Sequence, residues 1–158
     1  MERIVVGLIS DTHGLLRADV HDAFAGVDLI LHAGDVGPQS ILDELALIAP
    51  VTAVRGNTDA PGNPSLLDRI DRTLGGVRVH VSHGHELGSP TLPRLLKAYD
   101  ADVIVYGHTH RQFIGRGDGR LVVNPGAAGA RRFDLLPSVA RMTIVEGVVS
   151  AEIVALAP

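Results

Sequence analysis

The sequence predicts an α/β protein, and two observations support this fold class. Between residues 3 and 54, apolar runs of strand length alternate with segments of helical spacing in a β-α-β-α-β order, which is typical of a parallel sheet with crossover helices. The last third of the chain alternates short apolar runs with glycine turns, a pattern of antiparallel hairpins. With 46% hydrophobic residues and no linker, residues 1–158 are expected to form one domain.

The first third of the chain supplies the parallel strands. Residues 3–9 are an almost unbroken apolar run, and residues 15–25 place apolar side chains at helical spacing. Residues 27–33 form a second apolar strand. A second helix is expected over 38–48, because proline suits its first turn and an apolar face follows. Residues 51–54 complete the third strand.

The remainder of the chain changes to hairpins around one more crossover. Residues 69–74 and 77–82 flank a Gly-Gly turn and predict a hairpin. A helix is expected over 92–99, followed by an apolar strand over 102–106.

Two further hairpins are predicted near the C-terminus. The first pairs residues 112–116 with 120–123 across a loop at 117–119, where glycine permits a positive φ. The second pairs residues 139–145 with 148–156.

Composition excludes several classes of function. The formal net charge of −4 leaves no basic footprint, so general nucleic-acid binding is not expected. The chain has no cysteine, which excludes disulfides and thiolate metal sites. The N-terminal apolar run is too short for a signal peptide, and no run approaches membrane-spanning length. We therefore expect a cytoplasmic protein without membrane contact; a homo-oligomer is left open.

Metal-competent side chains follow five of the predicted strands. Because ligands bind at the carboxyl ends of strands in α/β sheets, these side chains are expected to meet at one edge. Nearby glycines allow the backbone to turn sharply and approach a ligand. The set comprises Asp11, His13, Asp35, Asn57, His83, His108 and His110.

Seven ligands are more than one catalytic ion uses, since such an ion takes about three protein ligands and keeps an open position. The set divides into two sites that share Asp35 as a bridge. Nitrogen and oxygen ligands without sulfur suit Mn²⁺, Fe²⁺ or Zn²⁺. We expect two divalent ions, with manganese first and iron, zinc or nickel as alternatives.

The order and context of these motifs resemble the calcineurin-like metallophosphoesterases, most closely the small bacterial and archaeal phosphodiesterases. The resemblance extends over essentially the whole chain and implies a four-layer α/β/β/α sandwich of two mixed sheets flanked by helices. The motifs that carry it are Asp11-x-His13, Gly34-Asp35, Gly56-Asn57, His83-Gly84-His85, Gly107-His108-Thr109-His110 and Asn124-Pro125-Gly126.

The resemblance also implies ligand sets and an activity. One ion takes the side chains of Asp11, His13, Asp35 and His110. The other takes those of Asp35, Asn57, His83 and His108. A hydroxide that bridges the two ions attacks a small phosphate ester, most often a diester, with Asp35, Asn57 and His83 as the catalytic ligands.

One position departs from the pattern of this family. Many members have a histidine after the Gly-Asn pair that protonates the leaving group or binds the phosphate, and here Thr58 takes its place. Threonine cannot donate a proton with a pKa near neutrality. We therefore keep Thr58 as a substrate-binding residue and expect a structural role for Asp59.

The other polar residues have weaker assignments. His85 is expected to contact substrate, with replacement of His83 as ligand as the alternative. Arg131, or its neighbour Arg132, is expected to reach an anionic substrate from a flexible glycine turn. His32 is expected to be a hydrogen-bonded core residue. His21 and His80 are expected on solvated or polar faces, and Arg55 in an ion pair.

Two other functions fit the same fold. One is a protein-interaction scaffold that binds metal poorly, because a subunit of the eukaryotic retromer coat resembles this family and is viewed in that way. The other is a phosphoprotein phosphatase, which the short chain disfavours since it has no insertion to cradle a peptide. A complete ligand set favours the enzyme.

Overall fold

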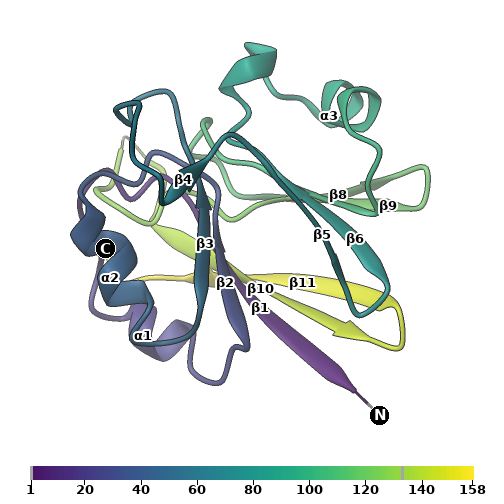
Figure 1. Cartoon of the computed structure of the whole chain (residues 1–158), viewed down its shortest axis with the longest axis horizontal. Coiled ribbons are helices and arrows are strands. Elements are labelled where there is room, and N and C mark those ends of the chain that lie inside the picture. The colour runs from purple at the N-terminus through teal and green to yellow at the C-terminus, as the bar shows by residue number, and fades with distance from the viewer. Residues whose placement is uncertain (1, 133) are drawn as a thin grey trace.

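The computed structural model describes residues 2–132 and 134–158 and consists of two β-sheets that face each other, with helices outside (Figure 1). The first sheet has the strand order β11-β10-β1-β2-β3-β4. Its strands β1, β2, β3 and β4 are mutually parallel, and β10 pairs antiparallel with both β1 and β11. Their bounds are β1 Arg3–Ile9, β2 Leu29–His32, β3 Val51–Val54, β4 Leu66–Leu67, β10 Ser138–Val145 and β11 Val148–Ala155.

The second sheet has the order β5-β6-β7-β9-β8 and is also mixed. Strands β6, β7 and β9 run parallel, while β5 and β8 pair antiparallel at the two edges. The bounds are β5 Ile70–Leu74, β6 Val77–Val81, β7 Val103–Val105, β8 Phe113–Gly117 and β9 Arg120–Asn124.

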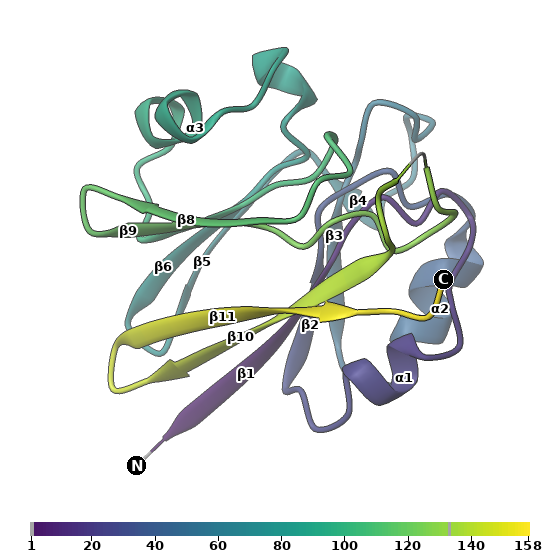
Figure 2. The same cartoon turned by 180° about the vertical axis from the view of Figure 1, so that it is seen from behind.

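Four short helices complete the described chain, and three of them pack outside the sheets. In Figure 2, α1 and α2 lie beside the first sheet and α3 lies over the second. The 3-10 helix η1 follows β6 by a short loop. The bounds are α1 Val20–Ala23, α2 Gln39–Leu45, η1 His85–Leu87 and α3 Leu92–Ala98.

Alternation along the central strands explains the four layers. On β1, Val6 and Leu8 enter the cluster between the two sheets, whereas Val5 and Ile9 pack beneath the helices of the first sheet. A strand covered on both faces must be apolar throughout, as this one is. Residues on β7 likewise alternate between the central cluster and the one under α3. The predicted four-layer sandwich is therefore confirmed.

The helix expected over residues 15–25 is wrong for its first half. Only Val20–Ala23 is helical, although Val20 and Phe24 are buried as the spacing indicated. The Arg17 side chain donates hydrogen bonds to the carbonyls of Gly129 and Ala157, both at 3.0 Å. These tertiary contacts hold the preceding segment as a loop and override its helical spacing.

Two smaller expectations also need correction, and one short strand was not expected. The loop expected at residues 117–119 is a tighter two-residue turn, since Gly117 pairs with Arg120. Strand β4 was not predicted, because two residues are too few to show a period. His80 is fully buried and not solvated: its ring stacks on Tyr99 with centroids 3.8 Å apart. A polar strand face can thus be covered by one aromatic ring from another element.

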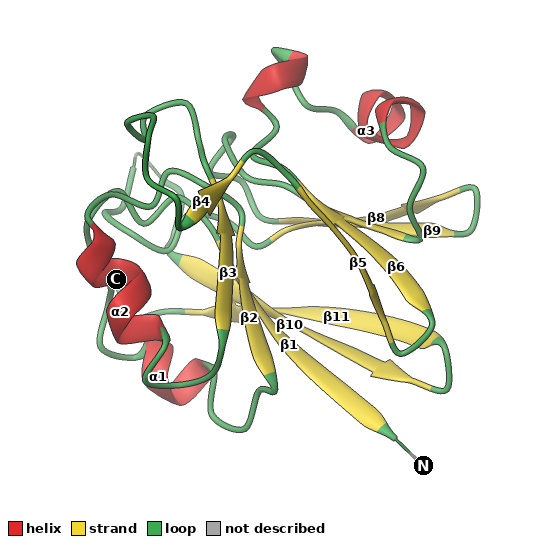
Figure 3. Cartoon of the chain, viewed as in Figure 1, coloured by secondary structure: helices red, strands yellow, loops and turns green. Residues whose placement is uncertain are grey.

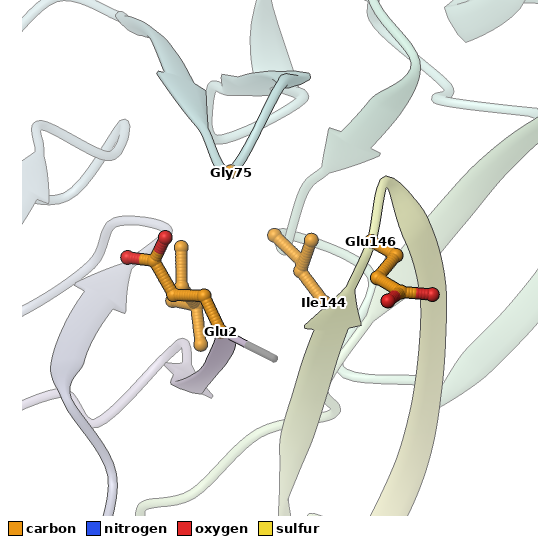
Figure 4. Close-up of a pocket in the computed structure, with 5 residues that line it drawn as sticks. Glu2, Gly75, Ile144 and Glu146 are labelled. Atoms are coloured by element: carbon orange, nitrogen blue, oxygen red, sulfur yellow. The ribbon is translucent and has the colours of Figure 1, made fainter.

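The two ends of the sandwich differ in character. Figure 3 shows loops gathered beyond the carboxyl ends of β2 and β3. At the opposite end of β1 lies a depression of about 180 Å³ between Gly75 and Ile144, with Glu2 and Glu146 at its rim (Figure 4). This far depression holds no histidine. Within the described ranges, every helix is too short to cross a bilayer.

Candidate metal centre

The candidate ligands from both sheets meet where β1, β2, β6 and β7 end. The backbone N–H of Asp11 donates to the carbonyl of Gly34 at 2.9 Å, which joins the ends of β1 and β2. The backbone N–H of His108 donates to Asp11 Oδ2 at 3.1 Å, which joins this pair to the second sheet. A Cβ atom on Gly107 would collide with the Ser10 hydroxyl, so only glycine permits this approach.

One group of possible ligands consists of Asp11, His13 and His110. The Nε2 atoms of the two histidines are 3.3 Å apart. Asp11 Oδ1 lies 3.6 Å from the Nε2 atom of His13 and 3.4 Å from that of His110. Three ligand atoms at these separations can bind one cation between them. These three residues are the ligands predicted for the first ion, except that Asp35 is missing from the group.

A second group consists of Asp11, Asp35 and His83. His83 Nε2 lies 3.2 Å from Asp35 Oδ2 and 3.8 Å from Asp11 Oδ1. The two groups therefore share Asp11. Asp35 Oδ2 is also 3.6 Å from His13 Nε2, so this oxygen lies between the two groups as well. The bridging role of Asp35 stays a prediction.

Unsatisfied buried atoms test whether these residues suit a metal. Among the described residues, Asp11 Oδ1, His83 Nε2 and His110 Nδ1 are buried without a hydrogen-bond partner. His83 Nδ1 donates to the carbonyl of Ala33 at 2.8 Å, which leaves a lone pair on Nε2. Buried polar atoms without partners are costly unless another group satisfies them. A cation at the centre would satisfy Asp11 Oδ1 and His83 Nε2, and these residues fit one; His110 faces the centre with its other nitrogen, Nε2.

Electrostatics at the centre favours a cation in the same way. Burial opposes ionisation of Asp11 and Asp35, but the neighbouring histidines, together with hydrogen bonds from Ser10 to Asp11 and from Thr58 to Asp35, outweigh it and lower the pKa of each carboxyl. The interaction with Asp11 raises the pKa of His13. Burial disfavours protonated His83, but Asp35 and Asp11 together raise its pKa. Two buried carboxylates thus attract positive charge to this point.

The loops around the centre are held by hydrogen bonds from backbone N–H groups to the carboxylates of Asp59 and Asp35. Asp59 accepts hydrogen bonds from the backbone N–H groups of Val36, Gly37 and Gly56 at 2.9–3.1 Å, which confirms its structural role. The backbone N–H of Thr58 donates to Asp35 Oδ1 at 2.9 Å. These bonds fix the carboxylate of Asp35 against the loop after β3.

His32 is a fully buried core residue, as expected. Its Nδ1 atom accepts a hydrogen bond from the N–H of Gly34 at 3.1 Å, and its Nε2 atom lies 3.0 Å from the Thr12 hydroxyl. That hydroxyl donates to the Val36 carbonyl at 2.7 Å. Burial lowers the pKa of His32 to about 4, so the ring is neutral at pH 7.

Most of the candidate ligands have a left-handed backbone. The positive φ angles run from 47° to 70°, and the residues are Asp11, His13, Asp35, His108 and His110. Such angles are uncommon outside glycine, although Asp and His adopt them more readily than other residues. Four of the five, all but His108, lie in the two ligand groups, and strained backbone of this kind is concentrated at functional sites.

The other predicted site residues lie at the rim of this centre. The His108 ring centroid is 5.2 Å from that of His83, and the His85 centroid is 5.3 Å from it. Asn57 and Thr58 are exposed in the loop after β3. Their roles, with that of Asn57 as a ligand, stay predictions.

Arginine assignments are refined by the structure. Arg55 forms an ion pair with Asp68 at 2.7 Å, as expected. Burial lowers the pKa of His110, and the positive charge of Arg132 contributes to the shift. The contact of Arg131 or Arg132 with an anionic substrate stays a prediction. Two adjacent arginines after a glycine turn carry no signal that tells them apart.

Known proteins are similar to this chain in sequence and in fold. The calcineurin-like phosphoesterase superfamily domain matches residues 4–147. A probable metallophosphoesterase of Methanocaldococcus jannaschii is 38% identical over 143 residues, which cover 84% of this chain and 72% of the relative. A phosphodiesterase of the same organism is 27% identical over 139 residues, or 77% of this chain and 82% of the relative.

Among solved structures, Vps29 of Cryptosporidium parvum has a TM-score of 0.80 and 21% identity, with 99% of each chain covered. At this identity the likeness shows the fold alone. The family match extends over nearly the whole chain and includes every candidate ligand. The chain therefore belongs to the calcineurin-like phosphoesterase superfamily.

Proposed function

We propose that this protein is a dinuclear metal-dependent phosphoesterase that acts on phosphodiesters. The observation that carries the proposal is a pair of buried atoms at the centre, Asp11 Oδ1 and His83 Nε2, which lie 3.8 Å apart and have no hydrogen-bond partner within the described chain. Two divalent ions, manganese first, would be held by the ligand sets that the sequence predicts. Bound there, such ions neutralise phosphate charge and acidify water, the chemistry that phosphoester hydrolysis requires.

Hydrogen bonds within the chain orient the carboxylates of Asp11 and Asp35. Asp11 uses Oδ2 to accept hydrogen bonds from the Ser10 hydroxyl and the His108 N–H, at 2.6 and 3.1 Å. Its other oxygen is left to face the centre. Asp35 divides its oxygens in the same manner between the Thr58 N–H and the histidines. Both carboxylates are thus oriented before a ligand arrives, which limits the reorganisation needed on binding.

A diester is favoured over a monoester by two arguments. The relative named as a phosphodiesterase is similar over 77% of this chain. A diester also carries less negative charge, which suits a rim where Arg132 is the arginine whose charge acts on the centre. Thr58, His85 and either Arg131 or Arg132 would contact the ester there.

The test is hydrolysis of bis(4-nitrophenyl) phosphate and 4-nitrophenyl phosphate by protein dialysed against Mn²⁺. We expect faster cleavage of the diester and loss of activity with chelator. Asp35→Asn should lower kcat/KM on the order of 10²-fold or more, because a lost ligand forfeits several kcal/mol. His21→Ala, an exposed histidine on α1, is the matched control. Diester hydrolysis that survives both chelator and Asp35→Asn would refute the proposal.

The alternative is a protein-interaction scaffold, since proteins named Vps29 share this fold. A scaffold gains nothing from buried carboxylates and histidines whose lone pairs face one another. It would bind metal poorly and hydrolyse neither ester, so the same assay together with a metal-binding titration separates the two functions.

A further inference from the structure

A groove of about 310 Å³ lies beside the candidate metal centre. His85 forms the boundary, because its ring lies in the groove wall and its centroid is 5.3 Å from that of His83. A chemical group in the groove would therefore adjoin a phosphate at the centre. The side chains that line it include Arg55, Asp68, Arg69, His85, Glu86 and Tyr99.

Both arginines of the groove already have carboxylate partners. Arg55 Nη2 donates to Asp68 Oδ1 at 2.7 Å. Arg69 donates to both carboxylate oxygens of Asp71, from Nε at 2.6 Å and from Nη2 at 3.2 Å. These ion pairs neutralise both guanidinium groups, so neither offers a free positive charge to a further anion.

A third carboxylate faces the groove without an arginine partner. Glu86 Oε2 accepts hydrogen bonds from the Ser82 hydroxyl at 2.9 Å and the Tyr99 hydroxyl at 2.6 Å, and Oε1 accepts from the Gly84 N–H at 2.9 Å. These donors keep the carboxylate charged. Asp71 is outside the residues that line the groove but pairs with Arg69, so the cluster as a whole has three carboxylates against two guanidinium groups and a negative local charge.

We propose that this groove binds one ester arm of the substrate and that the arm is an uncharged alcohol bearing hydroxyl groups. The identification rests on the proposed function. The polar lining offers donors and acceptors to hydroxyls, and its volume is in the range of small-ligand sites. An arm with a further phosphate would meet net negative charge and be rejected.

The test compares two chromogenic diesters on the manganese-loaded protein. One is thymidine 5′-(4-nitrophenyl phosphate), and the other carries an added 3′-phosphate. We expect the first to have a kcat/KM on the order of tenfold higher, because the extra charge is repelled. Equal values, or a preference for the added phosphate, would overturn the proposal.

A variant should change this preference in a set direction. Asp68→Asn removes the partner of Arg55 and frees its guanidinium for the added phosphate, so the ratio of the two kcat/KM values should fall severalfold. Asp22→Asn, an equal charge change on the exposed helix α1, should leave the ratio unaltered. A ratio that changes equally in both variants would indicate a general charge effect and would refute the groove as the binding site of the arm.

Thymidine alone separates this proposal from the proposed function. In an NMR titration it should shift the backbone amide signals of Arg69, Gly84 and Tyr99, whether or not the protein hydrolyses esters. Absence of diester hydrolysis with these shifts present would refute only the phosphodiesterase activity. Absence of the shifts would refute the groove as a binding site for the arm.

Discussion

At the residue scale, Thr58 has the most direct consequence for chemistry. It is exposed beside Asp35, and its backbone N–H is committed to that carboxylate. Its hydroxyl cannot serve as an acid near neutral pH. The departing alkoxide would then leave without a proton from this position, so leaving-group stability should control the rate.

We predict a steep dependence of kcat/KM on leaving-group pKa across a series of aryl and alkyl diesters. Thr58→His should flatten it by restoring a donor, with gains of about 10²–10⁴-fold for alkyl esters and little gain for nitrophenyl esters. Thr58→Gln, which adds bulk without an acid, is the control. A shallow dependence in the native protein would show that another group already donates the proton.

His32 makes a separate prediction about pH and stability. Its pKa is about 4 when folded, against an ordinary 6.5, so below pH 6.5 the unfolded chain binds the extra proton first. Its contribution to the unfolding free energy is therefore intact above pH 6.5 and falls by about 1.4 kcal/mol per unit toward pH 4.

Denaturant unfolding in chelator, at several pH values between 6.5 and 4, measures this contribution. His32→Gln should be less stable at pH 7 yet lose less stability on acidification than the native protein. His21→Gln, at an exposed site, should follow the native curve. If the unfolding free energy of His32→Gln falls with pH as steeply as that of the native protein, burial does not lower the proton affinity of His32.

At the scale of elements, the loop after β3 depends on one small residue. A Cβ atom on Gly56 would collide with the backbone nitrogen and the Oδ1 atom of Asp35. Its φ lies outside the left-handed region, so the requirement is close approach and not backbone conformation. The turn after β3 can therefore reach the turn after β2 only with glycine here.

Gly56→Ala should displace Asp35, lower the unfolding free energy by about 1–3 kcal/mol and weaken metal binding. Gly117→Ala is a suitable control, since its Cβ would meet only the terminal methyl of Leu96, 2.5 Å away on a flexible side chain. Denaturant unfolding and a Mn²⁺ titration measure the two effects. Unchanged metal affinity in Gly56→Ala would show that Asp35 does not need this contact.

The sequence was informative about elements wherever a local pattern decided them. The Gly75-Gly76 turn, with both φ angles positive, and the apolar run of β1 each follow from local chemistry. Prediction failed where distant residues decided the outcome. Arg17 holds its segment as a loop through Gly129 and Ala157, and no local pattern contains that information.

The candidate site was likewise predictable where local sequence decided it and unpredictable where distant residues did. Residue types at strand ends predicted that the ligands would gather, because parallel strands share an edge. Which of them lie within reach of one another depends on how the second sheet approaches the first. The sharing of Asp11 between two groups could therefore be found only in three dimensions.

At the scale of the whole molecule, the centre draws on both sheets. Asp11 and Asp35 follow strands of the first sheet, and His83 and His110 follow strands of the second. A cation bound by both pairs would link the sheets across one end of the sandwich. Binding to the folded state alone raises its stability by mass action.

Thermal unfolding should therefore shift on metal loading. At a free Mn²⁺ concentration 100-fold above Kd, the folded state gains about 2.7 kcal/mol, or a rise in Tm of about 5–10 °C for a chain of this size. The rise should vanish in chelator and shrink in Asp35→Asn. No rise at saturating Mn²⁺ would mean that the two sheets do not close on an ion together.

The left-handed backbone of five candidate ligands has a consequence for which residue each of these positions favours. Glycine adopts these angles freely, whereas other L-residues there cost about 1–2 kcal/mol. If stability alone decided the residue, glycine would therefore be preferred at each of these positions. The sequence instead carries aspartate or histidine at positions 11, 13, 35, 108 and 110. These five side chains therefore carry a conformational cost that glycine would not carry, and we expect metal binding by their carboxylate and imidazole groups to offset it.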